Sequence, residues 1–319
     1  MTKKNVLLFR IKSILYDIKN LIKYNNPYQI VRRKIWAKNY YKKFPIEEIN
    51  LKKSDFDIYT IAFNNVDVID YQIRLLKKYL KDKHFHIIAD NSNKEDISKR
   101  IKDLCLKYDV WYIKLPENIL FCSHSHWAAL NYLYKNYVEK RKPKYFWLLD
   151  HDIFPIKDTS ILERFWNQDF YGYLVDKNRR WYIYGNQWML WPWFSFYKYW
   201  VFKKFNFFTT KWLFPRPYAL DTWGWNRRLI FRKFQKDKIN FVDRKLIGVD
   251  ENGEREISYD ICIDGKKVPH NFSSTYEIIG NKEWLHKQGT YLNNPNDAEE
   301  VLKYKNSVAI FLSRIDSFL

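Results

Sequence analysis

The feature that most constrains the fold is an alternation of short apolar strands with amphipathic helices between about residues 55 and 150. Four segments are rich in the β-branched and aromatic residues typical of strands, at 57–63, 85–89, 110–115 and 145–149. Segments with the apolar spacing of helices follow the first three, at 68–80, 97–108 and 125–138. This order predicts an α/β fold with a mostly parallel sheet and covering helices.

Polar and acidic residues follow these strands, at the edge where open α/β sheets bind ligands. Asn64 ends the first strand and Asp90 ends the second, while Asp150 and Asp152 follow the fourth, a run of five apolar residues. Both carboxylates emerge at the C-terminal edge of this strand, and strand alternation points them to the same side. Paired carboxylates suit Mg²⁺ or Mn²⁺, which also take diphosphate oxygens and water as ligands.

Several common classes are not favoured. No GxGxxG follows the first strand and no GxxxxGK[ST] occurs, which argues against a dinucleotide-binding Rossmann domain and a P-loop nucleotidase. Three cysteines without a CxxC spacing argue against a disulfide scaffold and a zinc ribbon, and favour a reducing compartment. With no apolar run of 18 residues and no secretory signal, we expect a cytoplasmic protein that lies, at most, against a membrane.

The charge is strongly basic and unevenly distributed. Lys and Arg number 56 against 36 Asp and Glu, a formal net charge of +20, which predicts an anionic partner. Residues 1–45 contain twelve basic residues and one acidic residue, and apolar residues recur at helical spacing over 7–22. This amphipathic segment either docks on an anionic membrane or a partner, or packs on the main body with its basic face in solvent.

The strand ends at Asn64 and Asp90, together with the DxD motif at Asp150 and Asp152, resemble the GT-A glycosyltransferases, specifically bacterial family-2-like enzymes. The resemblance covers roughly 55–155 and extends loosely to about 290. It implies a GT-A type sheet, a nucleotide-sugar donor, Mn²⁺ or Mg²⁺ as cofactor, and a surface-polysaccharide or lipid-linked glycan as acceptor.

The resemblance also implies roles for single residues. Asn64 and Asp90 would line the nucleotide-sugar site, with Asp90 contacting the base. Asp150 would contact the ribose or the metal, Asp152 would bind the metal directly, and His286 would be a further metal ligand. The ending of the second strand and the absence of a clear ED pair after the motif depart from the family pattern, which leaves the catalytic base open.

An inverting transfer needs a carboxylate that takes the proton of the acceptor hydroxyl. We predict Asp221 for this role, although an aspartate at this place is also a typical helix N-cap. Trp223 and Trp225 flank it and could stack on sugar faces of the acceptor. We interpret His124 and His126 as residues at the start of a helix, with His124 near the diphosphate.

The predicted organisation has three parts. A basic amphipathic helical extension covers 1–50, and the GT-A domain covers 51–300. Within that domain, the nucleotide-sugar half spans about 51–155 and the acceptor half about 156–300. A closing helix covers 301–319.

Three other functions stay open. The charge and the interleaved aromatic residues also suit a nucleic-acid-binding protein, although the basic excess is concentrated in residues 1–45 and no zinc-knuckle, RNP-like or helix-turn-helix signature occurs. A nucleotidyltransferase would use the same paired aspartates but normally has a Gly-rich phosphate loop. A non-catalytic membrane adaptor is the third. The donor sugar and its base, the acceptor, the stereochemistry and the oligomeric state are not specified by these patterns.

Overall fold

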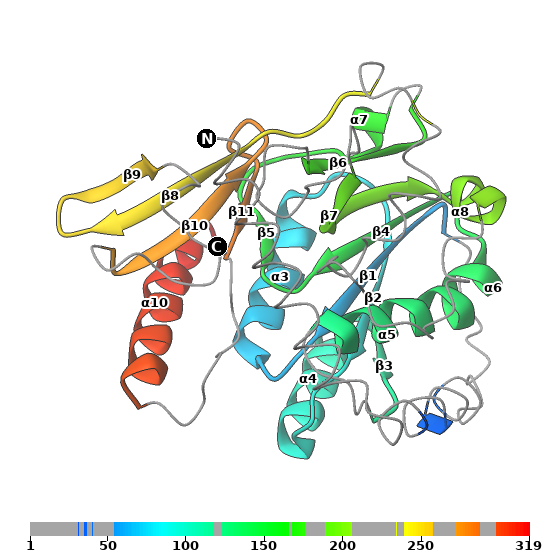
Figure 1. Ribbon diagram of the computed structural model, residues 1–319, viewed down its shortest axis with the longest axis horizontal. Coiled ribbons are helices and arrows are strands. Elements are labelled where there is room, and N and C mark those ends of the chain that lie inside the picture. Colours follow the sequence, from blue (N-terminus) through cyan, green and yellow to red (C-terminus); the bar gives the residue numbers. More distant parts are fainter. Residues whose placement is uncertain are drawn as a thin grey trace, which may run out of the picture.

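Two sheets and their covering helices make up the computed structural model of the chain (Figure 1). It describes residues 31, 35, 36, 40, 54–117, 123–165, 168–175, 189–205, 234, 239–257, 272–287 and 298–319. None of the helices within these residues is long and apolar enough to cross a membrane.

The first sheet has six strands, and the four that begin it are parallel. Their order across the sheet is β3 (Trp111–Lys114), β2 (Phe85–Asp90), β1 (Phe56–Ala62), β4 (Tyr145–Asp150), β7 (Met189–Lys198) and β6 (Phe170–Val175). β7 runs antiparallel to β4, and β6 antiparallel to β7. The predicted α/β class with a mostly parallel core is confirmed, and each of the four predicted strands lies within one residue of its observed bounds.

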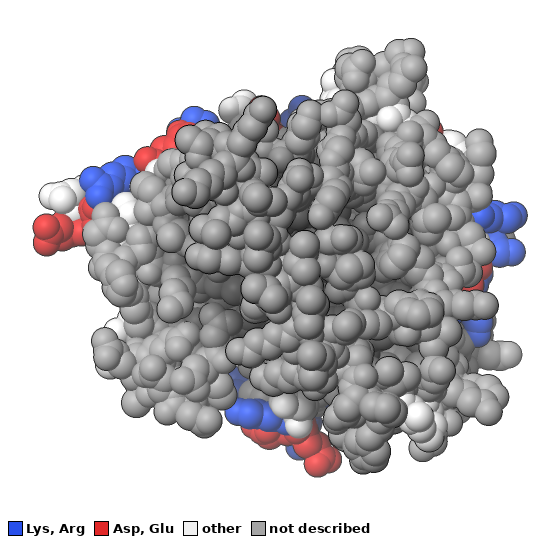
Figure 2. Space-filling model, viewed as in Figure 1, with Lys and Arg blue, Asp and Glu red and all other residues white. Residues whose placement is uncertain are grey.

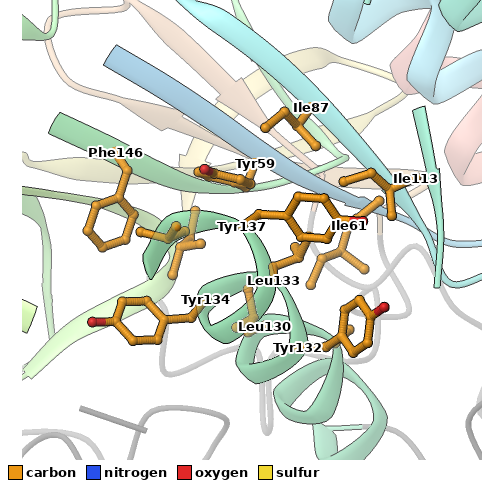
Figure 3. Packing of buried hydrophobic residues seen from close by; sticks show 14 of the residues in the cluster. Tyr59, Ile61, Ile87, Ile113, Leu130, Tyr132, Leu133, Tyr134, Tyr137 and Phe146 are labelled. Carbon is orange, nitrogen blue, oxygen red and sulfur yellow. The ribbon is translucent and has the colours of Figure 1, made fainter. Parts of the chain in front are cut away.

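Helices cover both faces of this sheet (Figure 1). One face carries α3 (Val66–Tyr79) and α4 (Glu95–Lys107), and the other carries α5 (Ser123–Leu133), the π-helical turn η1 (Tyr134–Val138) and α6 (Glu139–Arg141). Tyr59 and Ile61 point toward α5 and η1 (Figure 3), and Thr60 between them contacts α3. Strand alternation therefore produces two separate apolar layers, as expected for a sheet buried on both sides.

A second, antiparallel sheet lies beside the first (Figure 1). Its order is β5 (Ile153–Pro155), β11 (Trp284–His286), β10 (Ser274–Ile279), β8 (Arg244–Asp250) and β9 (Gly253–Ile257). Trp284 packs edge-on against Trp147 of β4, with ring centroids 5.1 Å apart, so a shared aromatic core joins the two sheets. The C-terminal helix α10 (Ala298–Asp316) packs on β10 through Phe311 and Tyr276.

Short elements complete the structure: α7 (Leu162–Phe165) follows β5, and α8 (Tyr199–Phe205) follows β7. Most of the predicted extension 1–50 lies outside the described residues. Of its described residues, Tyr40 is buried against Tyr132 of α5, with ring centroids 5.5 Å apart. Trp36 donates a hydrogen bond from Nε1 to the backbone oxygen of Glu117, 3.2 Å away. These two residues of the extension therefore contact the main body.

Figure 2 shows how charge is distributed over the described residues on one face. Acidic and basic side chains lie side by side on the β8–β9 hairpin, where Lys245 pairs with Glu256 at 2.7 Å and Arg255 pairs with Asp250 at 2.8 Å. Exposed pairs of this kind contribute little to stability, about 0–1 kcal/mol each. On this part of the surface the two signs of charge are mixed.

Candidate active site

The DxD motif lies in the turn where the chain passes from the first sheet to the second. β4 ends at Asp150 and β5 begins at Ile153. Because the strand stops at Asp150, alternation does not govern Asp152, and the premise that both carboxylates extend one strand is wrong. Asp150 Oδ1 lies 3.2 Å from Nε2 of His126, while Asp152 Oδ1 lies 3.6 Å from Nε2 of His286.

The second sheet explains why His286 reaches this turn. β11 pairs with β5 so that His286 lies opposite Ile153, the residue after Asp152. The backbone N–H of Lys287 donates to the backbone oxygen of Asp152 at 3.0 Å, which extends the pairing by one step. The structure thus brings together Asp150, Asp152 and His286, the three residues expected to hold a metal ion, and their role as ligands stays a prediction.

Glu277 lies behind His286, away from the motif. The two residues are direct cross-strand partners on β10 and β11, and Nδ1 of His286 lies 2.7 Å from Oε2 of Glu277. The other oxygen of Glu277 pairs with Arg244 of β8, and both side chains are almost completely buried. A hydrogen bond from Nδ1–H to Glu277 orients the ring so that Nε2 faces Asp152, the arrangement in which a carboxylate supports a metal-binding histidine.

Electrostatics around His286 favour positive charge at this point. Burial opposes protonation of the ring, but the hydrogen bond that His286 donates to Glu277 and the negative charges of Asp152, Glu277 and Asp150 outweigh it and raise the pKa of His286. A cation that binds to Asp152 and His286 would therefore compete with a proton on the imidazole.

His126 lies in the first turn of α5 and faces Asp150. Burial opposes ionisation of Asp150, but the charge and hydrogen bond of His126, helped by the nearby His151 and His286, keep the pKa of Asp150 below its ordinary value. The ring of His151 contacts the backbone oxygen of Ile61 at 3.1 Å and so fixes the turn to β1. Interpreting His126 only as a helix-entry residue missed its contact with Asp150, which the HxH pattern before a strand-end carboxylate could have suggested.

Asp90 ends β2 and is completely buried. Its carboxylate accepts hydrogen bonds from the backbone N–H of Ser92 at 2.8 Å, from Tyr112 Oη at 2.9 Å and from Lys114 Nζ at 3.1 Å. Burial raises the pKa of Asp90, but hydrogen bonds from Ser92 and Ser98, together with the charge of Lys114, lower it below its ordinary value overall. Asp90 is thus an ionised anchor at this edge, and its contact with a nucleotide base stays a prediction.

Asn64 lies in the loop between β1 and α3 and adopts the left-handed region, with φ of 50°, a conformation that asparagine tolerates well. Its backbone N–H donates to Ser92 Oγ at 2.8 Å, and its side chain exchanges hydrogen bonds with Asn93. Asn91 Nδ2 in turn donates to Ser125 Oγ of α5 at 3.0 Å. The loops after β1 and β2 and the first turn of α5 are therefore tied together at one edge of the sheet.

Four predicted residues cannot be placed. Asp221, Trp223 and Trp225 lie outside the described residues. His124 lies in α5, but its side chain is outside the described part of the structure.

The donors at the motif fit a divalent cation in chemical type. Carboxylate oxygens and an imidazole nitrogen are ligands that Mn²⁺ accepts, and carboxylate oxygens suit Mg²⁺. Within the described residues, no group of three or more His, Cys, Asp or Glu side chains converges closely enough to hold a metal ion. The donors stand instead as two neighbouring carboxylate–imidazole pairs, and a shared ion between them is a proposal.

Comparison with known proteins gives a distant, partial likeness. No family model matches the chain, and no curated protein does. Among solved structures, TarS of S. aureus aligns at 12% identity and a TM-score of 0.32, over 48% of this chain and 30% of that one. Core-mannan synthase A of Aspergillus fumigatus, in an Mn/GDP form, aligns at 10% identity and a TM-score of 0.39, over 63% and 75%.

A third structure is the mannosyltransferase PcManGT of Pyrobaculum calidifontis, in complex with GDP-Man and Mn²⁺. It aligns at 8% identity and a TM-score of 0.31, over 60% of this chain and 57% of that one. Of the full TarS structure, the alignment with this chain covers less than a third, 30%. At such low similarity, function has to be argued from the residues of this chain.

Proposed function

We propose that this chain is a metal-dependent GT-A-type glycosyltransferase that moves a sugar from a nucleotide-sugar donor to a surface-polysaccharide or lipid-linked glycan. One observation carries the proposal. Asp152 faces an imidazole, His286, that Glu277 holds from behind, and this pair adjoins Asp150 at the carboxyl edge of a parallel sheet. Open α/β sheets bind their ligands at this edge, and the DxD resemblance found in the sequence points to the same residues.

The chemistry needs a site for a leaving group of high negative charge. A divalent cation supplies Lewis-acid stabilisation of the departing nucleoside diphosphate. Asp150, Asp152 and His286 would hold it, and His126 beside Asp150 keeps that carboxylate ionised. Asn64 and Asp90 would hold the nucleoside. They follow β1 and β2, which lie one and two strands from β4, and the backbone N–H of Asn64 bonds Ser92 in the loop after Asp90.

The acceptor half of the reaction is proposed from sequence. Asp221 would take the proton of the acceptor hydroxyl, the role that an inverting transfer requires of a carboxylate. Trp223 and Trp225 would stack on sugar rings beside it. His124 would lie near the diphosphate.

We further propose a cytoplasmic enzyme that binds peripherally to the inner face of the membrane. The basic segment 1–45 would supply attraction to anionic lipid of about 1 kcal/mol for each Lys or Arg near the surface. A lipid-linked acceptor would be reached from such a position.

Thermal unfolding tests the donor site directly. The full chain is heated with UDP, GDP, CDP or CMP, each with Mn²⁺ and with a chelator, and Asp152→Asn serves as the control variant. A nucleotide present at 100 times its dissociation constant adds about 2.7 kcal/mol of stability if it binds only the folded state. A Mn²⁺-dependent shift with one nucleotide, lost in Asp152→Asn, supports the proposal. No shift with any nucleotide, together with a shift on adding oligonucleotides, favours nucleic-acid binding instead.

A further inference from the structure

Gln72 is a polar residue on the face of α3 that packs against the first sheet. Ile69, Ile73 and Leu76 on the same face are apolar and completely buried, and Gln72 is completely buried among them. Burying an amide without hydrogen bonds costs free energy, about 1–3 kcal/mol for each group left unsatisfied. A glutamine at this position is therefore tolerated because its amide makes the hydrogen bonds that offset the cost of burying it.

Those bonds close around the DxD turn. Nε2 of Gln72 donates to the backbone oxygen of Asp150 at 2.7 Å and to the backbone oxygen of Ile153 at 3.0 Å. Asp150 is the last residue of β4 and Ile153 is the first residue of β5. One amide group therefore joins the two ends of the turn, and Asp152 lies between them.

The orientation of this amide follows from its partners. Both backbone oxygens can only accept, so the nitrogen must face them and Oε1 accepts from the hydroxyl of Thr60, 3.0 Å away. That hydroxyl has a single proton, so Nε2 of His86, 3.0 Å from Thr60 Oγ1, must be the donor to it. Burial lowers the pKa of His86 well below its ordinary value, which agrees with a neutral ring that carries one N–H.

We propose that Gln72 is a positioning residue that fixes the spacing of Asp150 and Asp152, and thereby the affinity of the motif for a divalent cation. The inference rests on the function proposed above. His86 and Thr60 hold the amide from the far side, so a chain of three buried side chains runs from β2 through β1 and α3 to the turn. Outer partners of metal ligands typically change affinity by about 10–100-fold when they are replaced.

Two pairs of variants separate positioning from general stability. Gln72→Met keeps the length of the side chain and removes both donor and acceptor. Its matched control is Gln168→Met, because Gln168 also bonds backbone groups, donating to and accepting from Asn240. Gln168 precedes Asp169, whose backbone oxygen accepts from Lys198, the cross-strand partner of Tyr145. Because β4 begins at Tyr145 and ends at Asp150, Gln168 lies at the opposite end of β4 from the DxD turn.

The second pair is Thr60→Val, which removes the hydroxyl that holds the amide, and Thr60→Ser, which retains it. Two quantities are measured on each full-length variant: the dissociation constant of Mn²⁺ by isothermal titration calorimetry, and amide hydrogen exchange over residues 148–156. Thr60→Val keeps the inference testable if Gln72→Met does not fold.

The inference predicts faster exchange over 148–156 and about 10–100-fold weaker Mn²⁺ binding in Gln72→Met, with a smaller change of the same kind in Thr60→Val. Thr60→Ser and Gln168→Met should match the wild type in both quantities. If Gln72→Met and Thr60→Val keep the wild-type Mn²⁺ affinity, or keep the wild-type exchange rate over 148–156, the inference is overturned while the proposed function stands. A wild-type chain that binds no Mn²⁺ overturns the proposed function and the inference together.

Discussion

Replacing Glu277 by Gln separates the charge of this side chain from its shape. The amide oxygen of Gln can still accept a hydrogen bond from Nδ1–H of His286, so the ring keeps its orientation. The negative charge that faces both His286 and Arg244 is removed. The substitution therefore tests whether the buried carboxylate supports His286 as a metal ligand.

Two effects of different size are expected. Arg244 is 1% exposed and loses a counter-charge that is 0% exposed, and breaking a buried ion pair costs about 3–5 kcal/mol. This cost is a large part of the free energy of unfolding of a typical domain, which is about 5–15 kcal/mol. The metal site should lose about 10–100-fold in Mn²⁺ affinity, because the outer carboxylate no longer raises the basicity of the ring.

A companion variant distinguishes the two effects. Glu277→Gln combined with Arg244→Met removes the buried cation along with its partner, so it should regain much of the stability lost in Glu277→Gln. Urea unfolding gives the free energy of unfolding, and calorimetric titration of the folded chains gives the Mn²⁺ affinity. Affinity should stay low in both variants. Recovery of affinity in step with stability, or wild-type affinity in Glu277→Gln, would refute the supporting role of the carboxylate.

Two further predictions concern acid stability and membrane binding. The pKa of Asp90 is lowered on folding, so its ionised form contributes stability above its unfolded pKa of about 3.9, and this contribution is lost as pH falls through the lower folded value. The difference in unfolding free energy between wild type and Asp90→Asn should therefore be constant near pH 7 and shrink below about pH 4; a difference that grows on acidification would contradict this. Removal of residues 1–45 should reduce pelleting with anionic vesicles while nucleotide binding persists, and unchanged pelleting would disprove the docking of this segment.

The four parallel strands of the first sheet were predictable from sequence because their signals are local, whereas its antiparallel strands β6 and β7 were not predicted. Each of its parallel strands is a short apolar run, and each connecting helix has its own apolar period, so a window of a dozen residues identifies both. The polar residues at the strand ends, such as Asn64 and Asp90, followed directly from the same windows. The C-terminal helix was also visible in this way, and α10 covers Ala298–Asp316.

The second sheet was not predictable, because its pairing links distant parts of the chain. β5 and β11 have three residues each and are separated by about 130 residues, so neither carries a recognisable period. Their pairing places His286 beside Asp152. The sequence resemblance named His286, but the reason for its position lies in long-range strand pairing that local patterns do not contain.

Supporting residues were missed although the sequence contains a sign of them. Gln72 interrupts the apolar face of α3, and Glu277 is a charged residue within β10, Ser274–Ile279, whose residues are nearly all buried. A polar or charged residue within a buried segment indicates a buried hydrogen-bond partner, because burial without one is costly. Only the fold identifies that partner. Gln72 bonds the backbone oxygen of Asp150 directly, and Glu277 bonds His286, which lies beside Asp152.

The most direct test of the proposed function is turnover of the donor. The nucleotide sugar selected by the thermal unfolding panel is incubated with the full chain, Mn²⁺ and a lipid-linked glycan pool, and release of the nucleoside diphosphate is measured. Wild type should release it only with the metal, and Asp152→Ala should be slower by about 100-fold or more, since metal stabilisation of the leaving group is worth several kcal/mol. Equal, Mn²⁺-dependent release by Asp152→Ala would contradict the assignment of this turn as the catalytic centre.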